Sequence, residues 1–393
     1  MRQRPVAPLA APLAALLAAL LAASCAAPSQ PLLEAGGSAQ PAAEILDARE
    51  VVVLTAPPHE ATLARSLRLG YTEISTHRLT DLDEVLIVLA IPPGRTIAQA
   101  IAEIEAASPG ATAGAHHLYR LQSATGAEAG RFYANALIGW PDDGCEAVRS
   151  VGMIDAGVAP SHPGLADGRV VQRKFFETDA PPASDHGDLM AGLLTGPGRL
   201  TGAALHSANV VDPAIDGGDA AGVVGILRAV DWLRGEGVDV VNISLAGPRN
   251  KLLDRGLARA AARDMVLVAA AGNDGPAVPP RFPAAFPFVL AVTAVDRTLE
   301  VYDRAARGAE IDLAAPGVDI LLMDRGRMRV LNGTSAAAPF VTAAIAADHG
   351  LESLEISAVR RRLAAGARDL GPAGRDAIFG AGLVSAPESC GGG

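Results

Sequence analysis

The sequence lacks a strong excess of charge of either sign, and this absence argues against nucleic-acid binding. Lys and Arg number 33 and Asp and Glu number 43, which gives a formal charge of −10 spread along 393 residues. The one basic run, Arg360-Arg361-Arg362, lies in a helical pattern and is interpreted as a solvated helix face. Aromatic residues are also scarce, at 4%. We expect no nucleic-acid partner.

A long uninterrupted apolar run is missing as well. The best candidate, from about Ala7 to Ala23, contains two prolines and is shorter than the ~20 residues that a membrane-spanning helix needs. It follows Arg2 and Arg4, as the apolar core of an export signal does. We therefore assign residues 1–25 to a signal peptide and expect an exported protein that is periplasmic, extracellular or a membrane-anchored lipoprotein.

The end of this signal leaves two kinds of processing open. In "LLAASCAAPSQP", Cys25 follows small residues and resembles a bacterial lipoprotein signal, in which Cys25 becomes the lipidated first residue. Such signals prefer Leu where this chain has Ala22, so ordinary cleavage between Ala23 and Ala27 is the alternative. Only the lipid would bring the protein to a membrane. Residues 26–44, rich in Ala, Pro, Gly and Ser, are predicted to be a flexible linker.

Cysteine is rare, with three residues in the whole chain. Without Cys25, the pair Cys145 and Cys390 remains, one near each end of the main domain. A pair is the number expected in an exported protein, so a Cys145–Cys390 disulfide is our hypothesis.

Residues 45–122 form a compact block with a β-α-β-β-α-β pattern, typical of a small α+β, ferredoxin-like domain. The predicted strands are 50–56, 71–79, 84–91 and 116–122, and the predicted helices are 60–70 and 96–108. The adjacent His116 and His117 have no Cys or Asp at ligand spacing, so we interpret them as ordinary strand residues rather than metal ligands.

From residue 145 to 388 short apolar strands alternate with amphipathic helices, which predicts an α/β domain with a doubly wound parallel sheet. The predicted strands are 150–155, 207–212, 238–244, 265–272 and 287–295; helices are predicted at 220–235, at 249–264 and twice after residue 334. Reactive groups of such sheets cluster beyond the carboxyl ends of the strands.

Four polar residues follow these strands or begin the next helix: Asp155 in "GMIDAGV", His186 in "SDHGDLMAGLLTG", Asn273 in "AAAGNDGP" and Ser335 in "NGTSAAAPF". Singly, each has a structural explanation as a turn cap, a packed histidine or a residue tolerant of left-handed backbone. We place Pro339 in the first turn of a helix that starts at Ser335, where a proline costs no hydrogen bond.

Together these motifs, in the chain order Asp, His, Asn, Ser, resemble the subtilisin-like serine proteases (subtilases, peptidase family S8). The resemblance covers about residues 149–384. It implies that Ser335 is the nucleophile, that His186 transfers the proton and that Asp155 orients the imidazole. It also implies that Asn273 holds the oxyanion together with the Ser335 backbone N–H.

The same resemblance implies a polypeptide substrate that binds as an added strand between two backbone walls. The wall residues would be Ser244, Leu245, Ala246, Gly247, Ala270 and Gly272. No cofactor is required. Structural calcium is common in the family, but no run of residues resembles a calcium loop, so we place no metal ligand. We expect a monomer.

Secreted subtilases carry a propeptide of the form seen in residues 45–122, which aids folding and then inhibits the enzyme. We therefore predict a zymogen whose own propeptide is its first partner. Residues 123–144 would be a linker that contains the self-processing site.

Asp188 departs from the family, whose members usually have Thr or another small residue there, and we expect it to alter the cleft near the leaving group. Two alternatives stay open. One is an inactive, protease-like binding or scaffold protein, and the other is a maturation peptidase or ligase that uses the same triad.

Overall fold

The computed structural model describes residues 44–121, 124–125, 133–163, 167–179, 185–215, 219–324 and 327–391. The predicted signal peptide, Cys25 and nearly all of the flexible linker lie outside the described residues, as does part of the predicted processing segment. Within the described part of the chain, no helix is both long enough and apolar enough to cross a membrane.

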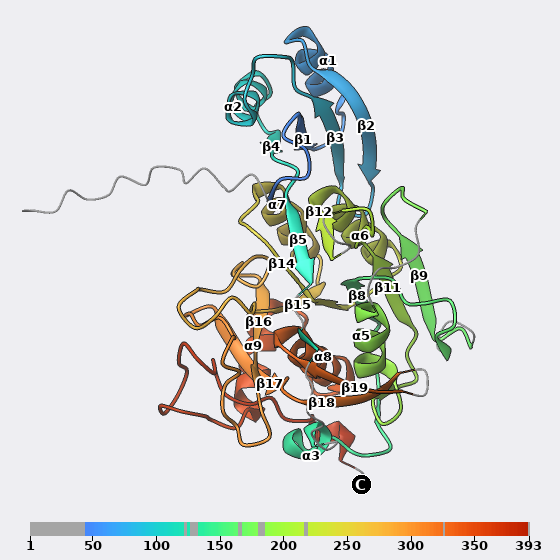
Figure 1. The fold of residues 1–393 in the computed structure, drawn as a ribbon, viewed down its shortest axis with the longest axis vertical. Coiled ribbons are helices and arrows are strands. Elements are labelled where there is room, and N and C mark those ends of the chain that lie inside the picture. Colours follow the sequence, from blue (N-terminus) through green and yellow to red (C-terminus); the bar gives the residue numbers. More distant parts are fainter. Residues whose placement is uncertain are drawn as a thin grey trace, which may run out of the picture. The chain divides into compact units, whose positions relative to one another are not determined.

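The N-terminal block is a four-stranded antiparallel sheet with two helices (Figure 1). Its elements are β1 (Glu50–Thr55), α1 (Glu60–Arg68), β2 (Thr72–Leu79), β3 (Glu84–Ala90), α2 (Ile97–Ala107) and β4 (Thr112–Gly114). The strand order is β2-β3-β1-β4. Alternate residues of β1 and β3 face opposite sides, so Val53 packs with the residues buried beneath the two helices while Leu54 joins the core of the following domain.

The prediction that residues 116–122 form the last strand of this sheet is wrong. The fourth strand is β4, and the chain then leaves the sheet as β5 (Leu118–Leu121), which pairs with strands of the second domain. In the sequence, β5 resembles a further strand of the N-terminal sheet because it follows that sheet directly and contains apolar residues. Its partner strands, however, are β12 and β14, which lie far along the chain.

The second domain is built on a seven-stranded sheet in which all neighbours are parallel. Its order is β17-β16-β15-β13-β8-β11-β9. The bounds are β8 (Val151–Asp155), β9 (Val170–Lys174), β11 (Leu205–Asn209), β13 (Val240–Ile243), β15 (Val266–Ala270), β16 (Val289–Val295) and β17 (Ile311–Pro316). The predicted doubly wound α/β fold is confirmed.

Helices cover both faces of this sheet, and the strands alternate between two cores. Met153 of β8 packs with α5 (His186–Thr195) and α8 (Thr334–Ala347), while Ile154 packs with α6 (Val223–Gly235) and α7 (Lys251–Ala261). The α6–α7 core also includes Leu54, Leu79 and Leu86 of the N-terminal block. The α9 helix (Ile356–Gly366) follows α8.

Two edge strands were not predicted, and one strand was assigned to a helix. β9 buries only Val170 fully and therefore lacks an apolar run, while β17 contains Asp312 and ends in a proline. The residues of β12 (Ala220–Gly222) precede α6 directly and were predicted as its first turn. Small residues carry little propensity information, and the partner strand decided their conformation.

Short elements complete the domain: β6 (Ala124–Thr125), α3 (Ala134–Ile138), β7 (Cys145–Glu146), β10 (Leu200–Thr201), β14 (Leu245–Ala246), β18 (Ile320–Asp324), β19 (Arg327–Asn332) and a 3₁₀ turn at Glu388–Cys390. Cys145 and Cys390 form a disulfide that ties the start of the domain to its end. The bond spans a sequence separation of 245 residues.

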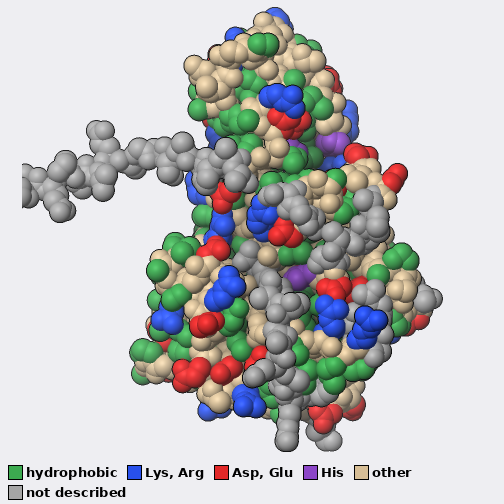
Figure 2. Space-filling model, in the orientation of Figure 1, with side chains coloured by type: hydrophobic (Ala, Val, Ile, Leu, Met, Phe, Trp, Pro, Cys, Tyr) green, Lys and Arg blue, Asp and Glu red, His purple; other side chains and the backbone are tan. Residues whose placement is uncertain are grey.

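The basic run is exposed at Arg361 and Arg362, as predicted, but two of its arginines also form ion pairs. Arg360 binds the buried carboxylate of Asp312 with two hydrogen bonds, and Arg362 binds Asp348 in the same way. On the face drawn in Figure 2, acidic and basic side chains are interspersed, with no extended patch of one sign among the described residues.

We predict that Cys145→Ser lowers the free energy of unfolding by about 2–5 kcal/mol, because the unfolded chain loses the restriction of a very long loop. Denaturant unfolding in a Ser335→Ala background, which prevents self-digestion, measures the loss. Cys390→Ser should give the same loss, and the double variant no more. An unfolding midpoint that is unaffected by reductant would contradict the prediction.

Candidate active site

Asp155 and His186 meet because the start of α5 packs directly on the turn after β8. Asp155 is the last residue of β8 and is fully buried, while His186 is the first residue of α5. Gly187 follows His186, and a Cβ there would lie 2.2 Å from the carbonyl oxygen of Ala156. Only glycine permits this approach, which explains the His-Gly pair of the sequence.

A sharp turn from β19 into α8 positions Ser335. Gly333 precedes the helix with φ of +133°, a backbone conformation that favours glycine. Ser335 is therefore the second residue of α8, where backbone N–H groups have no partner within the helix. Every residue of α8 is buried, and the alanines after Ser335 let the helix lie against the sheet.

The three side chains form one relay. His186 Nδ1 lies 2.6 Å from Asp155 Oδ1, and His186 Nε2 lies 3.4 Å from Ser335 Oγ. Asp155 Oδ1 also accepts a 2.7 Å hydrogen bond from the N–H of Ala156. A carboxylate on Nδ1 fixes the imidazole tautomer that leaves Nε2 able to accept a proton from a hydroxyl.

The prediction for Pro339 is wrong in one respect. Because α8 begins at Thr334, Pro339 is the sixth helical residue and lies beyond the first turn. Its ring nitrogen has no hydrogen, so the usual bond from residue 339 to the carbonyl of Ser335 cannot form. The proline thus removes one backbone hydrogen bond of α8, one turn after the nucleophile.

Asn273 lies next to the start of α8. It follows β15, and its Oδ1 accepts hydrogen bonds of 3.1 Å from both the N–H and the Oγ1 of Thr334. The N–H of Gly272 donates to the same Thr334 Oγ1. Thr334, which sequence reasoning did not single out, therefore orients the Asn273 amide beside the nucleophile.

The predicted strand-binding wall at residues 244–247 is occupied by the chain itself. β5 pairs antiparallel with β14, so that Leu121 lies opposite Leu245 and Arg120 opposite Ala246. On its other edge β5 pairs antiparallel with β12 (Figure 1). A three-stranded sheet results, and β5 is its central strand.

Two glycines make room for side chains in and just before β5. A Cβ at Gly247 would lie 2.4 Å from the ring of Tyr119, which is fully buried and donates a 3.2 Å hydrogen bond to Pro248 O. A Cβ at Gly222 would lie 2.5 Å from His116 Nε2. Burial raises the pKa of Tyr119, so its hydroxyl stays neutral.

The other predicted wall residues occupy different places. Ser244 is buried and accepts from Asn242, Ala270 ends β15, and Gly272 contacts Thr334 as described above. The second strand beside β5 is β12, which the sequence analysis had not assigned to the cleft. Three small residues before a helix carry no signal of such a role.

Asp188 supports the loop that follows the aspartate. It is buried in the first turn of α5, and its Oδ1 accepts a 2.7 Å hydrogen bond from the N–H of Ala159. The acidic residue thus fixes the backbone between Asp155 and α5. Three or more His, Cys, Asp or Glu side chains do not gather as a metal-binding group anywhere in the described residues.

Comparison with known proteins identifies the family of the chain. The family model of the subtilase family matches residues 148–382, more than half of the chain. Subtilisin DY of Bacillus licheniformis is 33% identical over 247 residues, which cover 60% of this chain and 88% of that protein. The minor extracellular protease Epr of Bacillus subtilis is 29% identical over 241 residues, which cover 60% of this chain but 37% of Epr.

Among solved structures, fervidolysin from Fervidobacterium pennivorans, described as a keratinolytic enzyme related to subtilisin, has the same fold. The TM-score is 0.69 at 20% identity, and the match covers 88% of this chain and 61% of fervidolysin. The chain belongs to the subtilase family and is a serine endopeptidase.

We predict that Asp188→Ala lowers the free energy of unfolding by about 1–3 kcal/mol, because the N–H of Ala159 loses its acceptor. Asp188→Asn, which keeps an acceptor oxygen, should lose much less. Denaturant unfolding of both variants in the Ser335→Ala background tests this. Equal stabilities of the Ala and Asn variants would contradict the role of the hydrogen bond.

Proposed function

We propose that the protein hydrolyses peptide bonds through an acyl-enzyme on Ser335 and is made as a self-processing zymogen. The observation that carries the catalytic part is the relay from Asp155 through His186 to Ser335, with contacts of 2.6 and 3.4 Å. Ser335 Oγ attacks the scissile carbonyl, and His186 accepts the hydroxyl proton and returns it to the leaving amine. Asp155 stabilises the imidazolium that forms in between.

The oxyanion is held by groups on two elements. The backbone N–H of Ser335 lies in the first turn of α8, where the helix dipole favours negative charge. The Asn273 side chain supplies the second donor. Its Oδ1 accepts two hydrogen bonds from Thr334. These bonds fix the orientation of the Asn273 amide, and so of its Nδ2 donor. Such preorganised donors act on the charge that develops in the transition state.

The zymogen part rests on how the chain crosses its own cleft. β5 fills the strand position between β12 and β14, and β6 then pairs with β19 at Leu331 and Asn332. Ser335 follows Asn332 by three residues. Leu121 is thus paired with β14, and Ala124 is paired with the strand that leads to the nucleophile. We place the processed bond in the span from Leu121 to Ala124. Ser335 is fully buried in this uncleaved form.

The N-terminal domain is anchored well enough to act as an inhibitor after cleavage. Glu84 of β3 is buried, and its carboxylate receives two hydrogen bonds from Arg255 of α7. At α6, Asp231 accepts from the N–H groups of Asp81 and Leu82, at 2.8 and 2.9 Å. Charge-assisted hydrogen bonds that are shielded in part from solvent bind more strongly than fully exposed ion pairs.

We also propose that the protein is exported and acts as a monomer on polypeptides. The N-terminal sequence pattern supports export, as does the name of the extracellular relative. Lipidation at Cys25 and plain cleavage of the signal remain the two routes. Cleft residues 244–247 and 220–222 would hold an extended substrate once β5 has left.

The decisive experiment compares the full chain with its Ser335→Ala variant during expression and purification. The unaltered chain should yield two fragments and then react with a fluorophosphonate probe at Ser335. The Ser335→Ala chain should stay whole and unlabelled. Mixing the two tests whether processing also occurs between molecules.

A folded chain that neither cleaves itself nor reacts with the probe would contradict the protease and favour a binding or scaffold role. Labelling together with transfer of the acyl group to an added amine, rather than to water, would favour a ligase.

A further inference from the structure

The central strand β5 turns its side chains to two opposite sides. Successive side chains of a strand point to opposite faces. Tyr119 is fully buried, whereas the side chain of Arg120 is 34% exposed. Arg120 lies opposite Ala220 of β12 on one edge and opposite Ala246 of β14 on the other. A chain that takes the place of β5 therefore meets the same two strand edges.

Tyr119 fixes the register of the strand between these edges. Its ring fills the space left by the absent Cβ of Gly247, and its hydroxyl donates a 3.2 Å hydrogen bond to Pro248 O. Both groups belong to the second domain and stay with it when β5 leaves. Because a slip of one residue would turn every side chain to the opposite face, the seated ring also decides which residue comes next at the surface.

Asp219, directly before β12, contacts the strand in two ways. Its carbonyl oxygen accepts a 3.1 Å hydrogen bond from the N–H of Leu121. Its Oδ1 accepts a 2.8 Å hydrogen bond from Nη1 of Arg120, and its side chain is 52% exposed. One residue of the second domain thus binds the backbone of the strand and the charged side chain that follows Tyr119.

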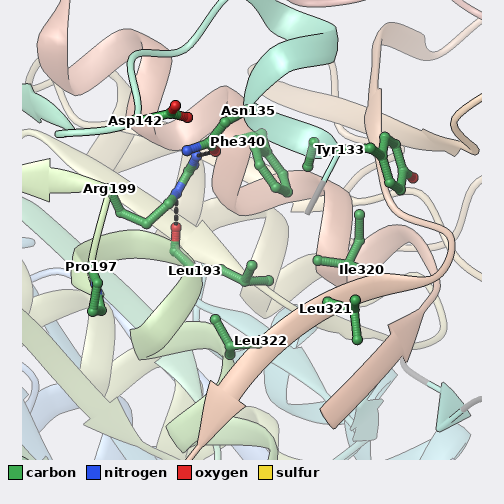
Figure 3. Close-up of a pocket in the computed structure, with 11 residues that line it drawn as sticks. Tyr133, Asn135, Asp142, Leu193, Pro197, Arg199, Ile320, Leu321, Leu322 and Phe340 are labelled. Carbon is green, nitrogen blue, oxygen red and sulfur yellow. Dashed lines mark hydrogen bonds between the residues drawn. The ribbon is translucent and has the colours of Figure 1, made fainter. Parts of the chain in front are cut away.

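This contact differs from those of arginines inside the second domain. Arg199, beside the cavity drawn in Figure 3, is buried, and its Nε donates to Leu193 O and its Nη1 to Asn135 Oδ1, each at 2.7 Å. Arg120 and Asp219, by contrast, lie on the two sides of the proposed processing site and part when the N-terminal domain leaves. Asp219 then presents its carboxylate at the edge of the vacated cleft.

On the basis of the protease function proposed above, we propose that Asp219 selects polypeptide substrates with a basic side chain directly after an aromatic residue. The aromatic ring takes the place of Tyr119, and the arginine or lysine takes the place of Arg120. Both lie upstream of the cleaved bond. The cation and the carboxylate form a charge-assisted hydrogen bond, as they do in the uncleaved chain.

The exposure of the pair sets the size of the preference. Ion pairs that are open to solvent contribute little, so kcat/KM should change by about two- to fivefold between arginine and a neutral residue. Salt screens such a pair, and the preference should therefore shrink in about 1 M NaCl.

The test uses the self-processed enzyme and a peptide with the sequence of residues 116–125, carrying a fluorophore and a quencher at its ends. Arg120→Gln in the peptide should lower kcat/KM about two- to fivefold, and Arg120→Glu should lower it further. A third peptide, in which Arg120 and Leu121 exchange places, keeps the charge but turns the cation to the other face, and it should lose the same advantage. This peptide separates a site for the cation from general attraction to an acidic protein.

Variants of the enzyme locate the carboxylate. Asp219→Asn should cleave the arginine and glutamine peptides equally well. Asp219→Arg, made together with Arg120→Glu so that the chain keeps an ion pair with its own β5, should no longer favour the arginine peptide. The matched control is Glu352→Arg, at an exposed carboxylate after α8, which should keep the preference of the parent.

A second measurement does not depend on catalysis. In the full-length Ser335→Ala chain, Arg120→Glu and Asp219→Arg should each lower the thermal midpoint, and the double exchange should restore part of the loss. Purely additive losses would contradict the contact.

The outcomes distinguish the selectivity from the protease function. Cleavage of none of the peptides contradicts the protease, and the selectivity with it. Equal cleavage of the arginine and glutamine peptides by the parent enzyme overturns the selectivity but leaves the protease standing. A preference for arginine that persists unchanged in Asp219→Asn assigns it to another residue and also overturns the proposal.

Discussion

The close packing of α5 on the turn after β8 is the contact on which the rest of the site depends. The absence of a Cβ at Gly187 lets the helix begin against the carbonyl of Ala156, and this places the His186 ring on the Asp155 carboxylate. Asp188 then fixes the same turn from within the helix. With the imidazole held there, Ser335 needs only the turn at Gly333 to come within reach of Nε2.

Both cores of the protein serve this arrangement. The core beneath α5 and α8 holds the histidine and serine helices against one face of the sheet, while the α6–α7 core extends without a break into the N-terminal block. The N-terminal domain therefore shares its apolar interior with the helices behind the cleft. After β4, the last strand of the N-terminal sheet, the chain continues as β5, which lies between β12 and β14.

Much of this could be predicted from the sequence because the signals are local. Apolar strands followed by Asp155 or Asn273 mark the carboxyl edge of a parallel sheet, and the motifs around His186 and Ser335 identified the family. The sequence does not indicate in the same way which strands pair with each other. Residues 118–121 and 220–222 form one sheet although about a hundred residues separate them, and neither segment carries a pattern that names the other.

Other features could not be predicted from the sequence, for related reasons. The role of Thr334 in holding Asn273 depends on a side-chain hydrogen bond between two loops, and the position of Pro339 depends on which residue starts α8.

The central claim is that the chain is cut between β5, which pairs with β14, and β6, which pairs with the strand that leads into α8. The most direct measurement is the N-terminal residue of the large fragment at the earliest stage of self-cleavage, read by intact mass and terminal sequencing. The account predicts that this residue is Gln122, Ser123 or Ala124, because Leu121 is paired with β14 and Ala124 is paired with Asn332, three residues before Ser335. A first cleavage anywhere outside that span would contradict it.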